Sequence, residues 1–295
     1  MTEILQNLAD GLGAGSTYAL FAVGVSLIFG VMHLVNFAHG ELLTLGAYLA
    51  YWMLLREFGW WVVVPAVIGA AVLGSMSIEF VAFRRIRGAN PFTLLLTSFA
   101  LEVLSHAVWK VFVSSKRKPF ATPEWAFESF AIGSVRFEWW NIVAFGVAVL
   151  SFAVTAFVLR RTMFGLAVRA AAEDFDAARL MGVKANRVIS GAFAFAGLLA
   201  GIASSLILMR KGGAEPRMGA DPLLKAVIAA VIGGLGSLPG AVAGGLALGV
   251  TEVFVRDLLP EDLGGLTDGL VFAVIALLFI VRPQGLFNVE TAERV

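Results

Sequence analysis

The sequence contains no cysteine and only three histidines in 295 residues. The absence of cysteine excludes disulfides and thiolate metal sites and leaves the redox compartment undetermined. The histidines form no ligand-spaced cluster, so we expect no metal site. The chain also lacks a Gly-x-x-x-x-Gly-Lys-[Ser/Thr] loop, so it does not bind ATP by that route. No nucleophile–base arrangement typical of a membrane enzyme is visible.

Charged side chains are scarce as well. They make up 15% of the chain, against roughly 25% in soluble proteins. Apolar residues reach 59%, and the mean hydropathy is +0.87. These values predict an integral membrane protein. The net charge of +1 gives no reason to expect nucleic acid as a partner. The first residues, MTEILQNLAD, are acidic rather than basic, so we expect no cleavable signal peptide.

Apolar segments close to the span length of about 20 residues recur along the whole chain. They lie at about 12–33, 38–55, 61–83, 91–113, 140–159, 188–209, 222–255 and 266–281. The segment 222–255 is too long for one simple helix and is interrupted by the sequence GGLGSLPG. We therefore expect a single transmembrane domain over 1–295. Its fold class is an all-α polytopic bundle of about eight transmembrane segments, with a broken or re-entrant segment near 222–255.

Basic clusters predict which ends of the spans face the cytoplasm. Arg84, Arg85 and Arg87 follow the third span, and Arg160 and Arg161 follow the fifth. The bias is small, since the loops on this side hold nine Lys and Arg and the loops on the other side hold eight. An interfacial aromatic belt is expected at the opposite ends, formed by Trp60, Trp61, Trp125, Trp139 and Trp140. Counting spans back places the N-terminus outside, unless an early segment is re-entrant.

A polar stretch of both charge signs, residues 169–182, separates two long apolar runs. Asp174 can accept from the first free N–H groups of a short helix, and Asp176 favours its positive start. Gly182 can adopt the left-handed conformation that ends a helix. The small alanines between them leave a face that a groove of another protein could enclose. The alternative is a solvated helix in an ordinary loop.

Polar residues beside membrane segments are candidates for the wall of a pathway. One such group lies between the first two spans and consists of Asn36, His39 and Glu41. These residues could line a pathway or mark a hinge where a helix restarts. The alternative is an ordinary loop in which Asn36 and His39 cap helix ends. Broken helices leave irregular backbone only where it lines a cavity. The break therefore adds four candidate pathway residues: Gly233, Gly234, Gly236 and Gly240.

The remaining charged groups in the spans favour structural roles. Glu102 and His106 lie one turn apart on a helix face and could relay protons, but a structural pair is the favoured interpretation. Glu79 is expected to form a local ion pair with Arg84 or Arg85, which lie close to it near the end of its span. Lys225 and Glu252 are expected to reach the interface. Glycines four residues apart are expected to pack helices closely, and they form the pairs Gly11–Gly15, Gly197–Gly201, Gly240–Gly244 and Gly245–Gly249.

Five landmarks occur in order along the chain: GSTYAL at 15–20, the polar stretch 36–41, the stretch 169–182, GGLGSLPGAVAGG at 233–245 and RPQGL at 282–286. Asp176, two alanines and Gly182 resemble the Glu-Ala-Ala-x-x-x-Gly pattern of the coupling loop in ABC transporter permeases, with Asp in the place of Glu. The Ile-x-Leu-Pro tail of other permeases is absent. Together the landmarks resemble LivH-type permeases of bacterial branched-chain amino acid importers, over nearly the whole chain.

The resemblance implies that a cytoplasmic coupling loop, about 160–187, contacts an ATPase. The residues implied in this contact are Glu173, Asp174, Asp176, Ala177, Ala178, Arg179 and Gly182. It also implies a multi-pass protein of the bacterial inner membrane, within the lipid bilayer. Its expected partners are a LivM-like second permease, two LivG- and LivF-like cytoplasmic ATPases that hold ATP and Mg²⁺, and a periplasmic or lipid-anchored binding protein. No cofactor is expected in this chain.

Other functions stay open on the residues alone. Related permeases serve urea, short amides or aromatic acids, and these residues do not separate the substrates. An ion-coupled secondary transporter could use Glu102 and His106, or Glu41, without ATPase partners. A membrane scaffold or enzyme subunit would show no substrate flux.

Overall fold

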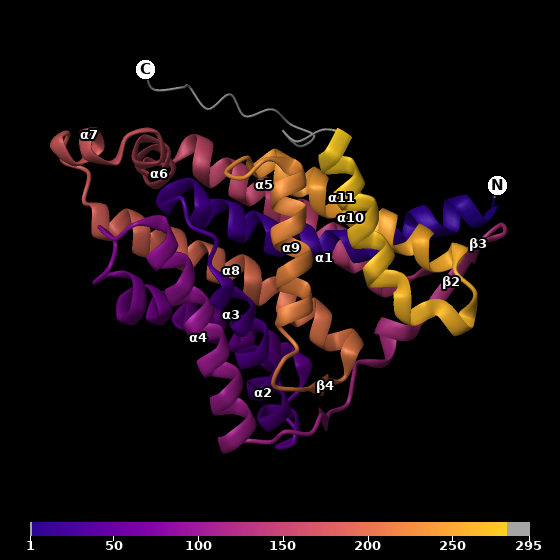
Figure 1. The fold of residues 1–295 in the computed structure, drawn as a ribbon. Helices are drawn as coiled ribbons and strands as arrows, with labels where there is room; N and C mark the ends of the chain where they lie inside the picture. Colours follow the sequence, from indigo (N-terminus) through magenta and orange to yellow (C-terminus); the bar gives the residue numbers. More distant parts are fainter. Residues whose placement is uncertain (1, 282–295) are drawn as a thin grey trace.

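The computed structural model describes residues 2–281, and helices dominate it (Figure 1). The α-helices are α1 (Thr2–Met32), α2 (Glu41–Leu54), α3 (Trp60–Ile78), α4 (Pro91–Phe112), α5 (Trp139–Arg161), α6 (Met163–Glu173), α7 (Phe175–Leu180), α8 (Ala185–Lys211), α9 (Ala220–Gly233), α10 (Leu238–Leu258) and α11 (Thr267–Val281). The expected all-α polytopic fold is therefore confirmed. The landmark at 282–286 lies outside the described residues.

Short elements join the helices. They are the 3₁₀ turns η1 (Phe37–Gly40), η3 (Glu124–Phe127) and η4 (Glu261–Leu266) and the π turn η2 (Glu79–Phe83). Two antiparallel strand pairs complete the described part of the chain: β1 (Lys118–Pro119) with β4 (Gly213–Ala214), and β2 (Ser129–Ile132) with β3 (Val135–Glu138).

All eight expected apolar segments form helices, but not all are long enough to cross a membrane. Within residues 2–281, six helices meet the length and hydropathy of a span: Thr2–Met32, Trp60–Phe83, Pro91–Phe112, Trp139–Arg161, Asn186–Lys211 and Leu238–Leu258. Helices α2 and α9 have 14 residues each. At 1.5 Å per residue they extend about 21 Å, less than the hydrocarbon core of about 30 Å. They are therefore partial spans.

Different elements lie at the two ends of the helix bundle (Figure 1). Helices α6 and α7 lie together at one end, which we call the coupling end. The first turn of α1 lies at the opposite end, beside the β2–β3 hairpin, where Thr2 and Ser134 hydroxyls are 3.3 Å apart. The N-terminal end of α1 thus lies on the side away from α6 and α7.

Close glycine contacts hold α1 at the centre of the helices. Helix α10 runs antiparallel to α1, so that Gly11 faces Val250 and Gly245 faces Ala19. A Cβ added at Gly245 would lie 2.4 Å from the Ala19 Cα. Gly201 likewise brings α8 against α3, with Ile68 Cα 2.7 Å from an added Cβ. The prediction that the spaced glycines serve packing is confirmed.

Candidate functional site

The chain re-enters the protein interior between α1 and α2. The Ser98 hydroxyl of α4 donates to the Val35 carbonyl, at 3.3 Å. The Glu41 carboxylate, at the start of α2, contacts His106 about two turns further along α4. Helix α2 therefore begins inside the bundle, as the interpretation of a restarting helix predicted.

The polar residues of this re-entry have different surroundings. The Asn36 side chain accepts from the Ala38 N–H at 3.1 Å and caps η1, as the alternative interpretation predicted. His39 is fully buried, with its ring edge-on to Phe21, and neither ring nitrogen hydrogen-bonds a described residue. His39 is therefore not the second cap that this alternative expected.

The ion pair of His106 differs from the expected one. His106 Nε2 lies 2.9 Å from Glu41 Oε1, so the pair joins α4 to α2. The structural pair expected along α4 with Glu102 is not among the ion pairs of the described residues. Side-chain spacing on one helix could not show this, because Glu41 reaches the same position from an element 65 residues away in sequence.

The break in the segment 222–255 is a tight turn between two antiparallel helices. Gly234 and Gly236 have φ of 91° and 87°, which only glycine adopts readily. The Ser237 hydroxyl caps α10 by accepting from the Gly240 N–H at 3.1 Å. The Gly236 N–H donates to the Ser26 hydroxyl of α1 at 3.0 Å. The predicted division into two helical pieces is confirmed, and the turn rests on α1.

Helices α9 and α10 touch backbone to backbone just beyond this turn. A Cβ added at Gly240 would lie 1.8 Å from the Gly233 carbonyl oxygen, and one added at Gly233 would lie 1.9 Å from the Gly240 oxygen. Of the four glycines expected at the break, these two therefore pack the hairpin together, and Gly234 and Gly236 form its turn.

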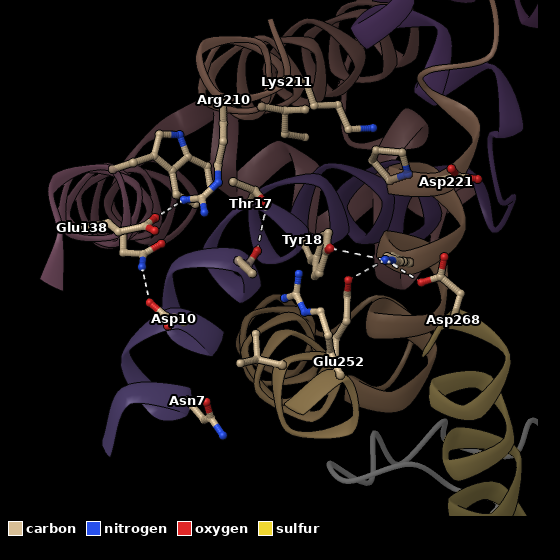
Figure 2. A pocket seen from close by; sticks show the side chains of 18 of the residues that line it. Asn7, Asp10, Thr17, Tyr18, Glu138, Arg210, Lys211, Asp221, Glu252 and Asp268 are labelled. Carbon is tan, nitrogen blue, oxygen red and sulfur yellow. Dashed lines mark hydrogen bonds and ion pairs between the residues drawn. The ribbon is translucent and has the colours of Figure 1, made fainter. Parts of the chain in front are cut away.

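A polar cavity of about 740 Å³ opens at the end away from α6 and α7, and we call it the far-end cavity (Figure 2). The Lys225 ammonium of α9 lies 2.9 Å from Glu252 of α10 and 3.0 Å from Asp268 of α11. It also donates to the Tyr18 hydroxyl of α1 at 3.4 Å. In Figure 2 the dashed lines from Tyr18, Glu252 and Asp268 converge on this ammonium. One lysine thus joins four helices.

This network corrects the expectation that Lys225 and Glu252 reach the membrane interface. Both side chains are largely buried, with exposed fractions of 10% and 13%, and they pair with each other. Further polar contacts line the same cavity, including Asn141 to Asp10 at 2.7 Å and the ion pair of Arg210 with Glu138. In the sequence, the signal for this network was the presence of a lysine and an acidic residue inside apolar segments.

A second cavity, of about 440 Å³, lies towards the coupling end, and we call it the coupling-end cavity. Its lining is mostly apolar and comes from α1, α5, α6, α10 and the turn at the break. Val168 and Arg169 of α6 and Gly236 of the turn line the same space. Asn36, His39 and Glu41 line neither this cavity nor the far-end cavity. Helix α6 and the broken segment therefore share a wall.

The start and stop predicted for the short helix in the stretch 169–182 are both present. Asp174 Oδ1 accepts from the Ala177 N–H at 3.0 Å, at the start of α7. At its end the Gly182 N–H donates to the Arg179 carbonyl and the Val183 N–H to the Ala178 carbonyl, each at 3.0 Å. This is a Schellman motif, and Gly182 has the φ of 88° that the motif requires.

Exposure divides the residues of this loop into two groups. Glu173, Ala177 and Arg179 are exposed, whereas Ala178 is only 6% exposed and packs within the chain itself. The side chain of Asp176 is not described. Leu180 and Met181 are 89% and 86% exposed, which makes an apolar tip that the sequence reasoning missed. Two large apolar residues in a polar loop were the signal.

The buried carboxylate of Glu79 binds several groups near the stretch 169–182. Glu79 of η2 is 1% exposed and accepts from Arg84 at 3.0 Å and from the Ser190 hydroxyl of α8 at 2.8 Å. It also pairs with Arg87. The expected local ion pair is confirmed, with Arg87 in the place of Arg85. Burial lowers the pKa of the Arg87 guanidinium from its ordinary value. This cluster joins the end of α3 to the start of α8.

The chain has relatives among known transport proteins. Residues 7–281 match the family model of the permease component of branched-chain amino acid transport systems. The chain is 33% identical to the high-affinity branched-chain amino acid transport system permease protein BraD of Pseudomonas aeruginosa, over 99% of this chain and 98% of that protein. It is 30% identical to LivH of Escherichia coli K12, over 99% and 97%. A solved inward-facing conformation of a putative metal-chelate type ABC transporter has a TM-score of 0.48 and 16% identity, over 93% of this chain and 85% of that one. On the family match and the identity to these relatives, the chain belongs to the family of branched-chain amino acid transport system permease components.

Proposed function

We propose that this permease component imports branched-chain amino acids across the bacterial inner membrane in an ATP-driven complex. One observation carries the proposal: α6 and the turn of the broken segment line the same cavity. A movement of the coupling loop would therefore act directly on the irregular backbone within the membrane. The mostly apolar lining of this cavity suits the aliphatic side chains of leucine, isoleucine and valine.

The pathway would use both cavities. Helices α1, α5 and α10 each contribute residues to the far-end cavity and to the coupling-end cavity. The polar far-end cavity suits the ammonium and carboxylate groups of an amino acid, and the other cavity suits its side chain. Of the predicted pathway residues, Gly236 has the strongest support, because it lines the coupling-end cavity. The other predicted pathway residues around the start of α2, namely Asn36, His39 and Glu41, line neither cavity and would have a structural role in the surrounding helices.

The coupling loop would dock on one of two ATPase subunits that bind ATP and Mg²⁺. The exposed residues Glu173, Ala177 and Arg179, together with the tip Leu180 and Met181, would form the contact. Closure of the ATPase pair would then bias a two-state arrangement of α6 and the broken segment. A LivM-like second permease would complete the pathway, and a binding protein would deliver substrate at the far end.

Uptake into proteoliposomes tests the proposal. The chain would be co-expressed with the ATPases and second permease of its own transport system, ATP would be enclosed in the vesicles, and the binding protein would be added outside. We expect ATP-dependent transport of leucine, isoleucine and valine, with little transport of urea, acetamide or benzoate. Transport of urea, an amide or an aromatic acid in preference to leucine would contradict the substrate class. Leucine uptake driven by a proton gradient without ATPases would contradict the mechanism.

A further inference from the structure

A third cavity, of about 810 Å³, lies beside the coupling loop. Four of its lining residues are basic, namely Arg87, Arg179, Lys184 and Arg187, and we call it the basic cavity. Its remaining lining residues are Gly88, Phe175 and Asn186, so none of the described lining residues is acidic. A concave site with this charge suits an anion that presents several oxygen atoms.

The described residues that line the basic cavity carry positive charge only. Glu79, the buried carboxylate beside Arg87, already pairs with both Arg84 and Arg87. Arg87 also donates to Asn186 at the start of α8. Lys184 and Arg187 are exposed and take part in no side-chain hydrogen bond or ion pair among the described residues. The cationic groups of Lys184 and Arg187 are therefore available to a ligand. The hydrogen bond between Arg87 and Asn186 joins the two sides of the wall on which they lie.

The position of the basic cavity favours a lipid as the ligand. Its wall is made by the link after α3, by α7 and by the first turn of α8, at the level where the membrane helices end. Four residues beyond Gly88, the exposed apolar residue Phe92 (66% exposed) begins the outward face of α4. Leu96 continues that face at 51% exposure. A phosphate group and an acyl chain could thus be bound side by side.

We propose that the basic cavity binds the headgroup of an anionic phospholipid of the cytoplasmic leaflet. Basic pockets between membrane helices on the cytoplasmic side are a recognised type of lipid headgroup site. Because the bound headgroup would contact both α7 and the fixed end of α3, it would hold the coupling loop in place. An acidic surface of the ATPase is the competing occupant. The apolar tip, Leu180 and Met181, is 89% and 86% exposed and does not line the cavity. The cavity therefore shares only Arg179 with the proposed ATPase contact.

Retention of lipid by the purified protein tests the inference. The variant is Lys184→Gln with Arg187→Gln, because both side chains are exposed and their loss leaves the packing intact. The matched control is Arg56→Gln with Lys116→Gln, an exposed basic pair at the far end. Each permease complex would be exchanged into detergent, mixed with phosphatidylglycerol or phosphatidylcholine, and examined by native mass spectrometry.

We expect the wild-type protein and the control to retain phosphatidylglycerol in preference to phosphatidylcholine. At about 1 kcal/mol for each basic residue, the double variant should bind phosphatidylglycerol roughly 25-fold more weakly. Raising the salt concentration should weaken binding by the wild-type protein, because the attraction is screened. Equal retention by wild type and double variant would overturn the inference, as would equal retention of both lipids by the wild type.

Two further measurements separate lipid from other anions. Inorganic phosphate at millimolar concentration should not displace the lipid, and displacement would indicate a site for free phosphate instead. In nanodiscs of phosphatidylcholine alone, the double variant should retain ATPase subunits as well as the wild type does. Loss of the ATPases there would indicate that the basic residues bind an acidic protein surface. This last arm rests on the proposed function, whereas the lipid measurement does not.

Discussion

Gly240 shows how a single side chain could control the broken segment. The Gly233 and Gly240 backbones are in contact, so any Cβ at Gly240 must separate α9 from α10. Gly236 is different, since its added Cβ would meet nothing closer than 3.9 Å, and only its φ of 87° requires glycine. The two glycines therefore restrict the break for separate physical reasons, close packing at one and backbone conformation at the other.

We predict that Gly240→Ala impairs transport more than Gly236→Ala does. Overpacking typically costs about 1–3 kcal/mol and here would also displace α9. The left-handed conformation costs a non-glycine residue about 1–2 kcal/mol. Gly146→Ala is the control, because a Cβ there meets nothing within 4 Å. Uptake by equal amounts of folded protein is the measurement, and normal uptake by the Gly240 variant would contradict a tight hairpin.

The contact of His106 with Glu41 allows a prediction about ionisable residues. We expect both His106→Gln and Glu102→Gln to leave ATP-driven uptake largely intact. In the first variant, the amide of the new glutamine can still donate a hydrogen bond to Glu41. His106→Ala should lower the free energy of unfolding by about 1–3 kcal/mol, because the buried Glu41 carboxylate loses its contact with the imidazole. Thermal unfolding in detergent measures the second effect. Lost uptake by well-folded His106→Gln, with an altered pH dependence, would instead support proton coupling.

At the scale of elements, local signals were readable from the sequence and long-range contacts were not. The cap at Asp174 and the stop at Gly182 depend on bonds within a few residues. The glycine-rich break was visible for the same reason. The partners of Lys225 lie on α1, α10 and α11. A single sequence gives no register between helices, so it could not show this network or the burial of Ala178.

The exposed tip of the coupling loop gives the next prediction. Leu180→Asp with Met181→Asp should weaken ATPase association by about tenfold or more, since fully burying one Leu or Met side chain contributes about 1.5–3 kcal/mol. The loop itself should stay folded, because both side chains are exposed. Pull-down of the ATPases is the measurement. Leu258→Asp is the control, an 81% exposed residue at the opposite end of the protein.

Ala178→Trp serves as a contrasting variant. It would disturb the packing of the loop within the chain as well as any docked groove, because Ala178 is buried. We expect it to lose ATPase association too, with greater protease sensitivity at the loop. Undiminished ATPase association and transport by both the tip variant and Ala178→Trp would show that α7 is a solvated loop helix.

At the scale of the whole molecule, large apolar surfaces remain uncovered. Of the residues of α4, only Leu94 and Ser98 are buried, and the exposed residues include Phe99, Leu104 and Phe112. Helix α5 likewise exposes large apolar side chains, namely Phe145, Leu150 and Phe157. Lipid covers such surfaces in a membrane protein, and a second permease would cover part of them.

The last prediction is that this chain transports nothing by itself. The sequence has no Gly-x-x-x-x-Gly-Lys-[Ser/Thr] loop through which ATP could supply the energy for transport. We therefore expect ATP-dependent uptake only when the ATPases, the second permease and the binding protein are present together, and we expect the subunits to co-purify. The measurement is labelled leucine uptake into proteoliposomes as each subunit is omitted in turn. A stable complex that contains this polypeptide alone and transports leucine would reject the subunit role. If a proton gradient alone drove that leucine uptake, the protein would be a secondary transporter.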